Sequence, residues 1–157
     1  MSTGHIIAIG GGGFTHSSDE DLDEYVINHV NKSKINIGFL PTASNDNQEK
    51  TDLFYKRFKS QKFKLSHFNL CSSVEGFNEW LLNKDIIYVG GGNTSEMINI
   101  WKRNNLIEVF KDAYENTRKQ IIRDIKSYDL TELKRMTENF FIKEEAYRNK
   151  VVEVDDL

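Results

Sequence analysis

The sequence predicts an α/β fold, a three-layer sandwich in which helices cover both faces of a mainly parallel β-sheet. Over residues 5–116, short apolar runs alternate with segments whose apolar residues recur at helical spacing. Several of these runs end in glycine or proline, as buried strands end in turns. Strands joined through helices of this length pair in parallel through right-handed crossovers.

The amino-terminal part predicts a strand, a helix and a second strand. His5–Ile9 is a short apolar run that ends in a row of glycines. A helix follows, opened by Ser17 or Ser18, because acidic residues come next and favour the positive end of a helix dipole. The second strand is Ile35–Leu40, and Pro41 ends it.

The next unit is a helix followed by a half-buried strand. Asp46 or Asn47 can cap the helix, because both side chains accept hydrogen bonds from backbone amides. Its apolar face comprises Leu53, Phe54 and Phe58. Phe63–Phe68 then alternates between apolar and polar residues, which predicts a strand.

The third unit contains the clearest central strand, Asp85–Val89, which leads directly into Gly90–Thr94. A short helix precedes it, with apolar residues Phe77, Trp80, Leu81 and Leu82. One or two helices follow it, marked by Met97, Ile98, Trp101, Leu106, Ile107 and Phe110.

The pattern changes at about residue 117, where helical spacing continues without further glycine. Asp129–Glu132 resembles a capping box, and Val151–Val154 is compatible with a short strand. We expect a single domain over residues 1–157, with an α/β core over 1–116 and a divergent helical tail over 117–157. In this interpretation the sheet is truncated after its fourth strand and completed by the carboxyl-terminal helices.

Composition excludes several classes of protein. With 157 residues, 38% hydrophobic and 29% charged, the chain is too apolar for a disordered tail and too charged for a membrane protein. A net charge of −3 disfavours nucleic acid and anionic membranes as partners. The single Cys71 cannot form an internal disulfide, and no basic segment precedes the first apolar run. We therefore expect a cytoplasmic protein without a membrane partner.

No metal or other cofactor is predicted. The four histidines, His5, His16, His29 and His67, are too scattered to form a ligand motif. The dinucleotide fingerprint requires a third glycine at its sixth position, but Thr15 or His16 stands there after the first glycine cluster. A tight turn between strand and helix explains that cluster better.

The second cluster, Gly90–Thr94, is more informative because it joins a buried strand to a helix. Without Cβ atoms, its backbone N–H groups can converge on a ligand oxygen, and the helix start adds positive potential. Such a loop suits an oxyanion or a carboxylate. Alternatively it is only a turn, with Thr94 as the helix cap.

Three segments together resemble the peptidase E family, the dipeptidase E and cyanophycinase group of serine peptidases. They are Ile7–Thr15, Gly38–Ser44 and Asp85–Thr94, and the stretches Trp101–Leu106 and Ala113–Asn116 continue the similarity. The resemblance covers about residues 5–116. It implies a flavodoxin-like or glutamine-amidotransferase-like fold and metal-free hydrolysis of short peptides, in some members those with an amino-terminal aspartate. It also implies that Gly91, Gly92 and Asn93 help form an oxyanion hole.

The chain departs from the family pattern after Asn116. The family has a strand leading to Gly-x-Ser-Ala-Gly there, whereas no glycine follows Gly92 in this sequence. Ser127, between Lys126 and Tyr128, does not substitute, because a nucleophile elbow needs small neighbours. The family's catalytic histidine lies downstream of the serine, and the last histidine here is His67.

We therefore expect a peptidase E-like chain without catalytic residues of its own. The expected binding site is a cradle of Gly91, Gly92, Asn93 and Thr94, with Gly11, Gly12 and Ser44 at its rim, for a short peptide or a small anion. The alternative is a binding or self-associating module, in which the exposed edge beside Asp85–Val89 pairs with a second copy.

Overall fold

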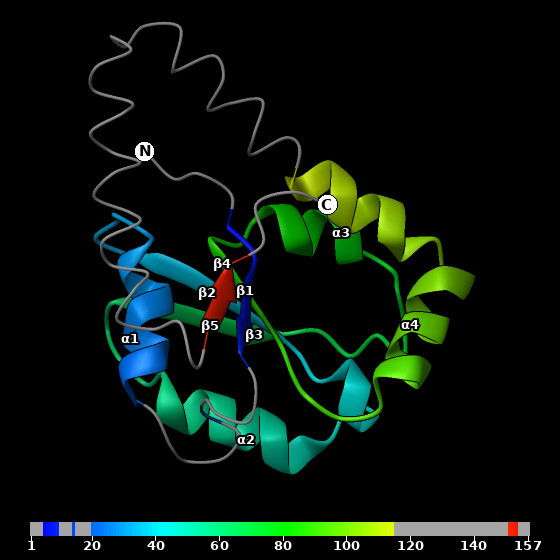
Figure 1. The fold of residues 1–157 in the computed structure, drawn as a ribbon, viewed down its shortest axis with the longest axis horizontal. Coiled ribbons are helices and arrows are strands. Elements are labelled where there is room, and N and C mark those ends of the chain that lie inside the picture. Colours follow the sequence, from blue (N-terminus) through cyan, green and yellow to red (C-terminus); the bar gives the residue numbers. More distant parts are fainter. Residues whose placement is uncertain (1–4, 10–13, 15–19, 115–150, 154–157) are drawn as a thin grey trace, which may run out of the picture.

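The computed structural model describes residues 5–9, 14, 20–114 and 151–153 (Figure 1). Its core is a three-stranded parallel sheet with the strand order β3-β2-β4. The strands are β1 (Ile7–Ile9), β2 (Ile35–Leu40), β3 (Phe63–His67), β4 (Ile86–Val89) and β5 (Val151–Glu153). The helices are α1 (Glu20–Asn28), η2 (Thr42–Ser44), α2 (Gln48–Arg57), α3 (Phe77–Leu82) and α4 (Thr94–Arg103). The predicted α/β class with helices on both faces is confirmed.

The central strand of this sheet is β2, flanked by β3 and β4. All of its residues except the half-buried Asn36 are buried, as expected for a strand covered on both faces. The strand expected at Asp85–Val89 is observed as β4, but it is not central in this sheet and lies at the edge that was also expected beside it. Within the described residues β4 is an edge strand, and Val89 at its end is 44% exposed.

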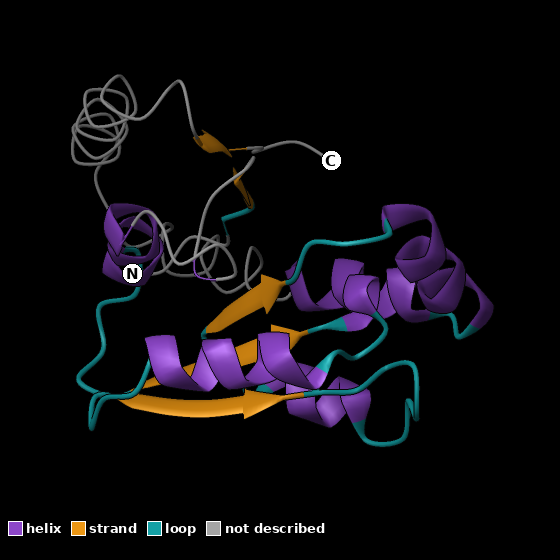
Figure 2. Ribbon diagram, turned by 90° about the horizontal axis from the view of Figure 1, so that it is seen from below, coloured by secondary structure: helices purple, strands orange, loops and turns teal. Residues whose placement is uncertain are grey.

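The first predicted strand does not join the parallel sheet. β1 pairs antiparallel with β5 in a separate two-stranded sheet, with Ile7 opposite Glu153. Figure 2 shows this short pair apart from the three longer arrows. Ala8 is exposed, so β1 lacks the burial on both faces that a strand inside a parallel sheet requires. The short strand expected at Val151–Val154 is confirmed over Val151–Glu153, whereas the helices expected over 117–150 lie outside the described residues.

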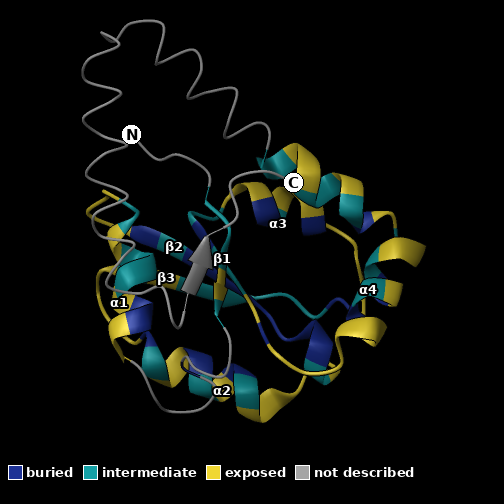
Figure 3. Cartoon of the chain, in the orientation of Figure 1, coloured by how far each residue is buried: buried dark blue, intermediate teal, exposed yellow. Residues whose placement is uncertain are grey.

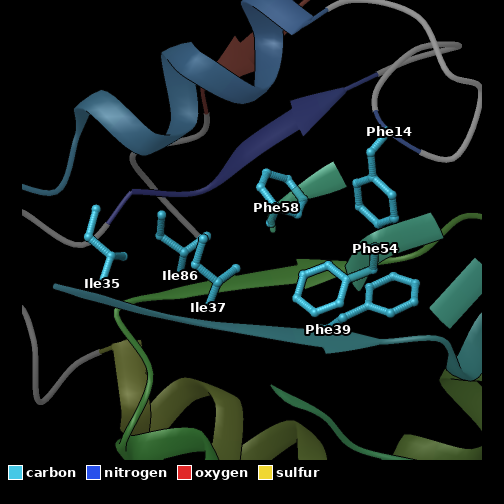
Figure 4. Close-up of a cluster of buried hydrophobic side chains, with 7 residues drawn as sticks. All are labelled: Phe14, Ile35, Ile37, Phe39, Phe54, Phe58 and Ile86. Atoms are coloured by element: carbon cyan, nitrogen blue, oxygen red, sulfur yellow. The ribbon is translucent and has the colours of Figure 1, made fainter. Parts of the chain in front are cut away.

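One face of the sheet packs against α1 and α2 (Figure 1). Alternate residues of a strand point to opposite faces, so every second residue of β2 belongs to this side. Figure 3 shows the buried segments, and Figure 4 draws the core on this face. Its buried members are Phe14, Ile35, Ile37, Phe39, Phe54, Phe58 and Ile86.

The other face is covered by α3 and α4. Its buried members are Leu40, Leu70, Phe77, Leu81, Ile100 and Leu106. Leu82 was expected on the apolar face of α3 but is 55% exposed, because the next residue along a helix turns by about 100° from Leu81. Of the one or two helices predicted after β4, two are present, α4 and a second helical segment over residues 106–114.

The predicted helix cap at Asn47 is confirmed, and the alternative cap Asp46 is wrong. The Asn47 side chain accepts a hydrogen bond from the backbone N–H of Lys50 at 3.0 Å, which satisfies one amide of the first turn of α2. α1 begins at Glu20 with three acidic residues in its first turn, whereas the expected caps Ser17 and Ser18 lie outside the described residues.

Candidate functional site

The loops that follow β2 and β4 meet at the carboxyl end of the sheet. Parallel strands bring their carboxyl ends to one edge, where ligands of open α/β sheets bind. The backbone N–H of Gly90 donates to the carbonyl of Leu40 at 2.9 Å, and that of Asn93 donates to the carbonyl of Ala43 at 2.6 Å. These two bonds fix the glycine loop against η2.

Gly92 makes the closest backbone approach in this site. A Cβ atom built on Gly92 would lie 2.1 Å from the Ala43 carbonyl oxygen and 3.0 Å from the Ser44 nitrogen. Gly91 differs, because a Cβ atom there would meet nothing within 4 Å. The loop conformation therefore requires glycine at 92 and tolerates a side chain at 91.

Two amides of the glycine loop are available to a ligand. Within the described part of the chain, the backbone N–H groups of Gly91 and Gly92 have no hydrogen-bond acceptor, and both residues are exposed. The amide of Asn93, a member of the predicted cradle, is already bonded to Ala43. The free donors of the loop itself are therefore those of the two glycines.

Asn93 caps the helix that follows the loop. Its side-chain oxygen accepts a hydrogen bond from the backbone N–H of Glu96 at 3.0 Å. The interpretation of Thr94 as the cap is therefore wrong, and Thr94 is the exposed first residue of α4. The positive end of the α4 dipole thus lies directly after the two glycines whose amides are free.

Lys50 adds a positive charge that the sequence did not indicate. Its ammonium donates a hydrogen bond to the carbonyl oxygen of Gly91 at 2.7 Å. Lys50 lies on the first turn of α2, close to the Asn47 cap, and 41 residues separate it from Gly91. A contact across that separation leaves no local pattern in the sequence.

The structure places one of the three predicted rim residues. Ser44 is half-buried next to Gly92, and its hydroxyl donates to the carbonyl oxygen of Pro41 at 2.8 Å. Gly11 and Gly12 lie outside the described residues.

Further polar atoms are buried at the same end of the sheet. One carboxylate oxygen of Asp46 accepts from the backbone N–H of Cys71 at 2.8 Å, and the other is buried without a hydrogen-bond partner. The Thr42 hydroxyl and the Asn69 side-chain oxygen are also buried and unpaired. Such atoms cost free energy unless a water or a ligand satisfies them.

Cys71 is inert rather than nucleophilic. Burial, and then the neighbouring Asp46 carboxylate, raise the pKa of its thiol to about 11. The thiolate, which is the reactive form, is therefore scarce at neutral pH. The thiol is free and half-buried.

Among the described residues, His67 pairs with a tyrosine and not with a serine. It ends β3, and its Nδ1 atom lies 3.0 Å from the hydroxyl of Tyr55 on α2. Burial raises the pKa of this tyrosine, so it remains neutral at physiological pH.

The described residues hold neither a cluster of metal ligands nor a membrane-spanning helix. No three histidine, cysteine, aspartate or glutamate side chains gather there as metal ligands. None of the described helices has the length and apolar character needed to cross a bilayer.

Comparison with known proteins supports the resemblance suggested by the glycine motifs. Residues 6–122 match peptidase family S51. A curated relative described as uncharacterized peptidase YgaJ, from Bacillus subtilis (strain 168), is 37% identical over 113 residues. That match covers 71% of this chain and 49% of the relative, so the chain spans about half the length of the curated relative. No solved structure gives a significant match. On this basis the chain belongs to peptidase family S51.

Proposed function

We propose that this chain binds the carbonyl or carboxylate end of a short peptide at the glycine loop but does not hydrolyse it unaided. The observation that carries the proposal is the pair of free backbone amides at Gly91 and Gly92, beside Lys50 and the start of α4. Convergent amides with positive potential stabilise an oxyanion or a carboxylate. Family membership favours a peptide over other carboxylates.

The proposed inactivity rests on two catalytic features that this sequence lacks. No Gly-x-Ser-x-Gly occurs in it, and no histidine follows His67. In serine hydrolases, the oxyanion hole and substrate binding without the triad retain roughly 10³–10⁴-fold acceleration over water, and the triad supplies about 10⁶-fold more. A chain that keeps only the amides can therefore still bind a peptide, but it loses most of the rate of hydrolysis.

Incubation with the dipeptide Asp-Leu tests the catalytic half of the proposal. We expect no release of free amino acids above the buffer control, measured by chromatography. Turnover near ordinary enzyme rates, about 1 s⁻¹ or faster, would refute it.

Thermal melting with the same peptide tests the binding half. At a peptide concentration tenfold above its dissociation constant, we expect Tm to rise by about 3–6 °C. Lys50→Met should reduce the rise, because it removes the charge beside the Gly91 carbonyl. Lys56→Met, in the last turn of the same helix, should keep it. An equal rise in both variants would contradict the assigned place of binding.

A second candidate function is self-association through β4. This strand is an edge within the described sheet, and Val89 on it is 44% exposed. Unpaired edge strands offer backbone donors and acceptors to another chain. Light scattering over a range of protein concentrations should then show a dimer, and Val89→Lys should shift it towards monomer. A monomer at every concentration would contradict this candidate.

We also propose a cytoplasmic location. The free thiol of Cys71 is compatible with a reducing compartment.

A further inference from the structure

A cavity of about 500 Å³ lies on the face of the sheet that α3 covers. It opens near the amino-terminal halves of β2 and β3, away from the glycine loop, which follows the carboxyl end of β4. Most of its lining is polar. The residues that line it include Asn36, Lys64, Ser66, Glu79, Trp80 and Lys84.

The strand register explains why a cavity forms there. Asn36 pairs with Lys64 and Gly38 pairs with Ser66, so these four residues share one face of the sheet. On the opposite face the same two strands carry isoleucine, phenylalanine and leucine, which pack into the core. α3 buries Phe77 and Leu81 in the apolar core of this face, but beside that core it meets the polar residues of β2 and β3, and the cavity lies there.

Trp80 on α3 forms one wall of the cavity. A Cβ atom on Gly38 would lie 2.7 Å from the Cη2 atom of Trp80, so the glycine makes room for the indole ring. The indole N–H donates to the hydroxyl of Ser66 at 3.0 Å. The hydroxyl accepts this bond, so its own proton remains available to a ligand.

Two lysines line the cavity without an anionic partner. The Lys84 ammonium lies 4.8 Å from the centre of the Trp80 ring, and its pKa is lowered by burial and then by the charge of Lys64, although Asp85 opposes the shift. Among the described residues neither lysine forms an ion pair. The neighbouring Asp85 carboxylate is bound by Lys32 and by the backbone N–H of Asn36.

Glu79 is the only carboxylate among the residues that line the cavity, and it is exposed. It forms no ion pair with either lysine among the described residues. The side-chain amide of Asn36 is likewise unpaired within the described part of the chain. Two ammonium groups, a hydroxyl and an amide therefore line one cavity as unused donors.

We propose that this cavity binds a phosphoryl group, either free phosphate or a small phosphomonoester, between Lys64 and Lys84. A phosphoryl group carries a charge of about −1.5 to −2 at pH 7 and three strong acceptor oxygens, which match two ammonium groups and two neutral donors. A single carboxylate brings one charge and two oxygens. A dianion also relieves the repulsion between the two ammonium groups, which Asp85, already bound by Lys32, offsets only in part.

Calorimetric titration in a phosphate-free buffer at constant ionic strength tests this site. Inorganic phosphate or glycerol 3-phosphate should bind with a dissociation constant of about 1 mM or tighter, a free energy near −4 kcal/mol or better. Acetate and chloride at the same ionic strength should bind at least tenfold more weakly. The tighter of the two phosphoryl probes identifies the source, a free ion or an ester. No heat with either phosphoryl probe, or equal binding of acetate, would overturn the proposal.

Matched variants locate the site. Lys64→Gln, which changes an exposed side chain, should weaken phosphate binding at least tenfold, and Lys64→Gln with Lys84→Gln should abolish it. Lys56→Gln, on α2 and away from the cavity, removes the same charge and should bind as the unaltered protein does. An equal loss in Lys56→Gln, or full binding by Lys64→Gln, would contradict the assignment. The single Lys64 variant keeps the test decisive even if the double variant fails to fold.

Discussion

Replacing Gly92 by alanine is expected to destabilise the protein by about 3 kcal/mol, the upper end of the cost of overpacking. The new Cβ atom would lie 2.1 Å from a backbone oxygen, that of Ala43, and a backbone atom cannot rotate away as a side chain can. The backbone at Gly92 also has a φ of 158°, an angle that residues other than glycine rarely adopt. Relief of the clash requires the loop to separate from η2, which breaks the bond from Asn93 to Ala43.

Thermal melting measures this effect. For a chain of this size, 3 kcal/mol corresponds to a fall in Tm of roughly 6–12 °C. Gly91→Ala is the matched control, because the same methyl group one residue earlier meets nothing within 4 Å. We expect that control to change Tm by no more than about 2 °C. Equal melting of the two variants would contradict the close approach of the two loops.

The contrast between these neighbours shows what the sequence can and cannot predict. A glycine cluster after an apolar run predicts a loop at the end of a strand. It does not say which glycine has no room for a Cβ atom, because that depends on Ala43, which is about fifty residues away along the chain. The same limit applies to Lys50, whose contact with Gly91 follows from tertiary packing alone.

Local signals predicted the parallel sheet well. The strand Ile35–Leu40 was predicted with its observed bounds, because a short, mainly apolar run ended by Pro41 is typical of a buried strand. The pairing of β1 was not predictable, since its partner β5 lies more than 140 residues later and neither three-residue strand has a distinctive pattern. The polar cavity likewise appears only once β2 and β3 are in register.

A buried ion pair between α1 and α2 gives the other large expected effect. Arg57 Nε donates to a carboxylate oxygen of Asp23 at 2.7 Å, and the Asp23 side chain is only 2% exposed. The guanidinium also contacts Glu20 at 2.7 Å. The other Asp23 oxygen and the hydroxyl of Tyr88 are buried without a well-formed hydrogen bond, and the nearby Tyr88 hydroxyl lowers the pKa of Asp23 less than Arg57 does.

Arg57→Met should therefore destabilise the protein by about 3–5 kcal/mol at pH 7, because it leaves a buried carboxylate without a partner. Asp23→Asn combined with Arg57→Met removes the charge as well and should recover most of the loss. Urea denaturation of both variants and of the two single variants closes a double-mutant cycle. Additive effects would show that the two side chains do not interact.

The pH dependence of the same variants provides an independent check. Burial raises the pKa of Asp23 above its ordinary value of 3.8, although Arg57 opposes the shift. A carboxyl with a raised pKa binds more protons in the folded state, so its contribution to stability is greatest below pH 3.8 and is lost as pH rises through the folded pKa. Arg57→Met removes the opposing charge and raises that pKa further. Its deficit relative to the unaltered protein should therefore be largest at neutral pH and shrink as Asp23 becomes protonated on acidification. A deficit that stays constant between pH 7 and pH 3.5 would mean that the cost arises from lost packing of the arginine rather than from the unpaired charge.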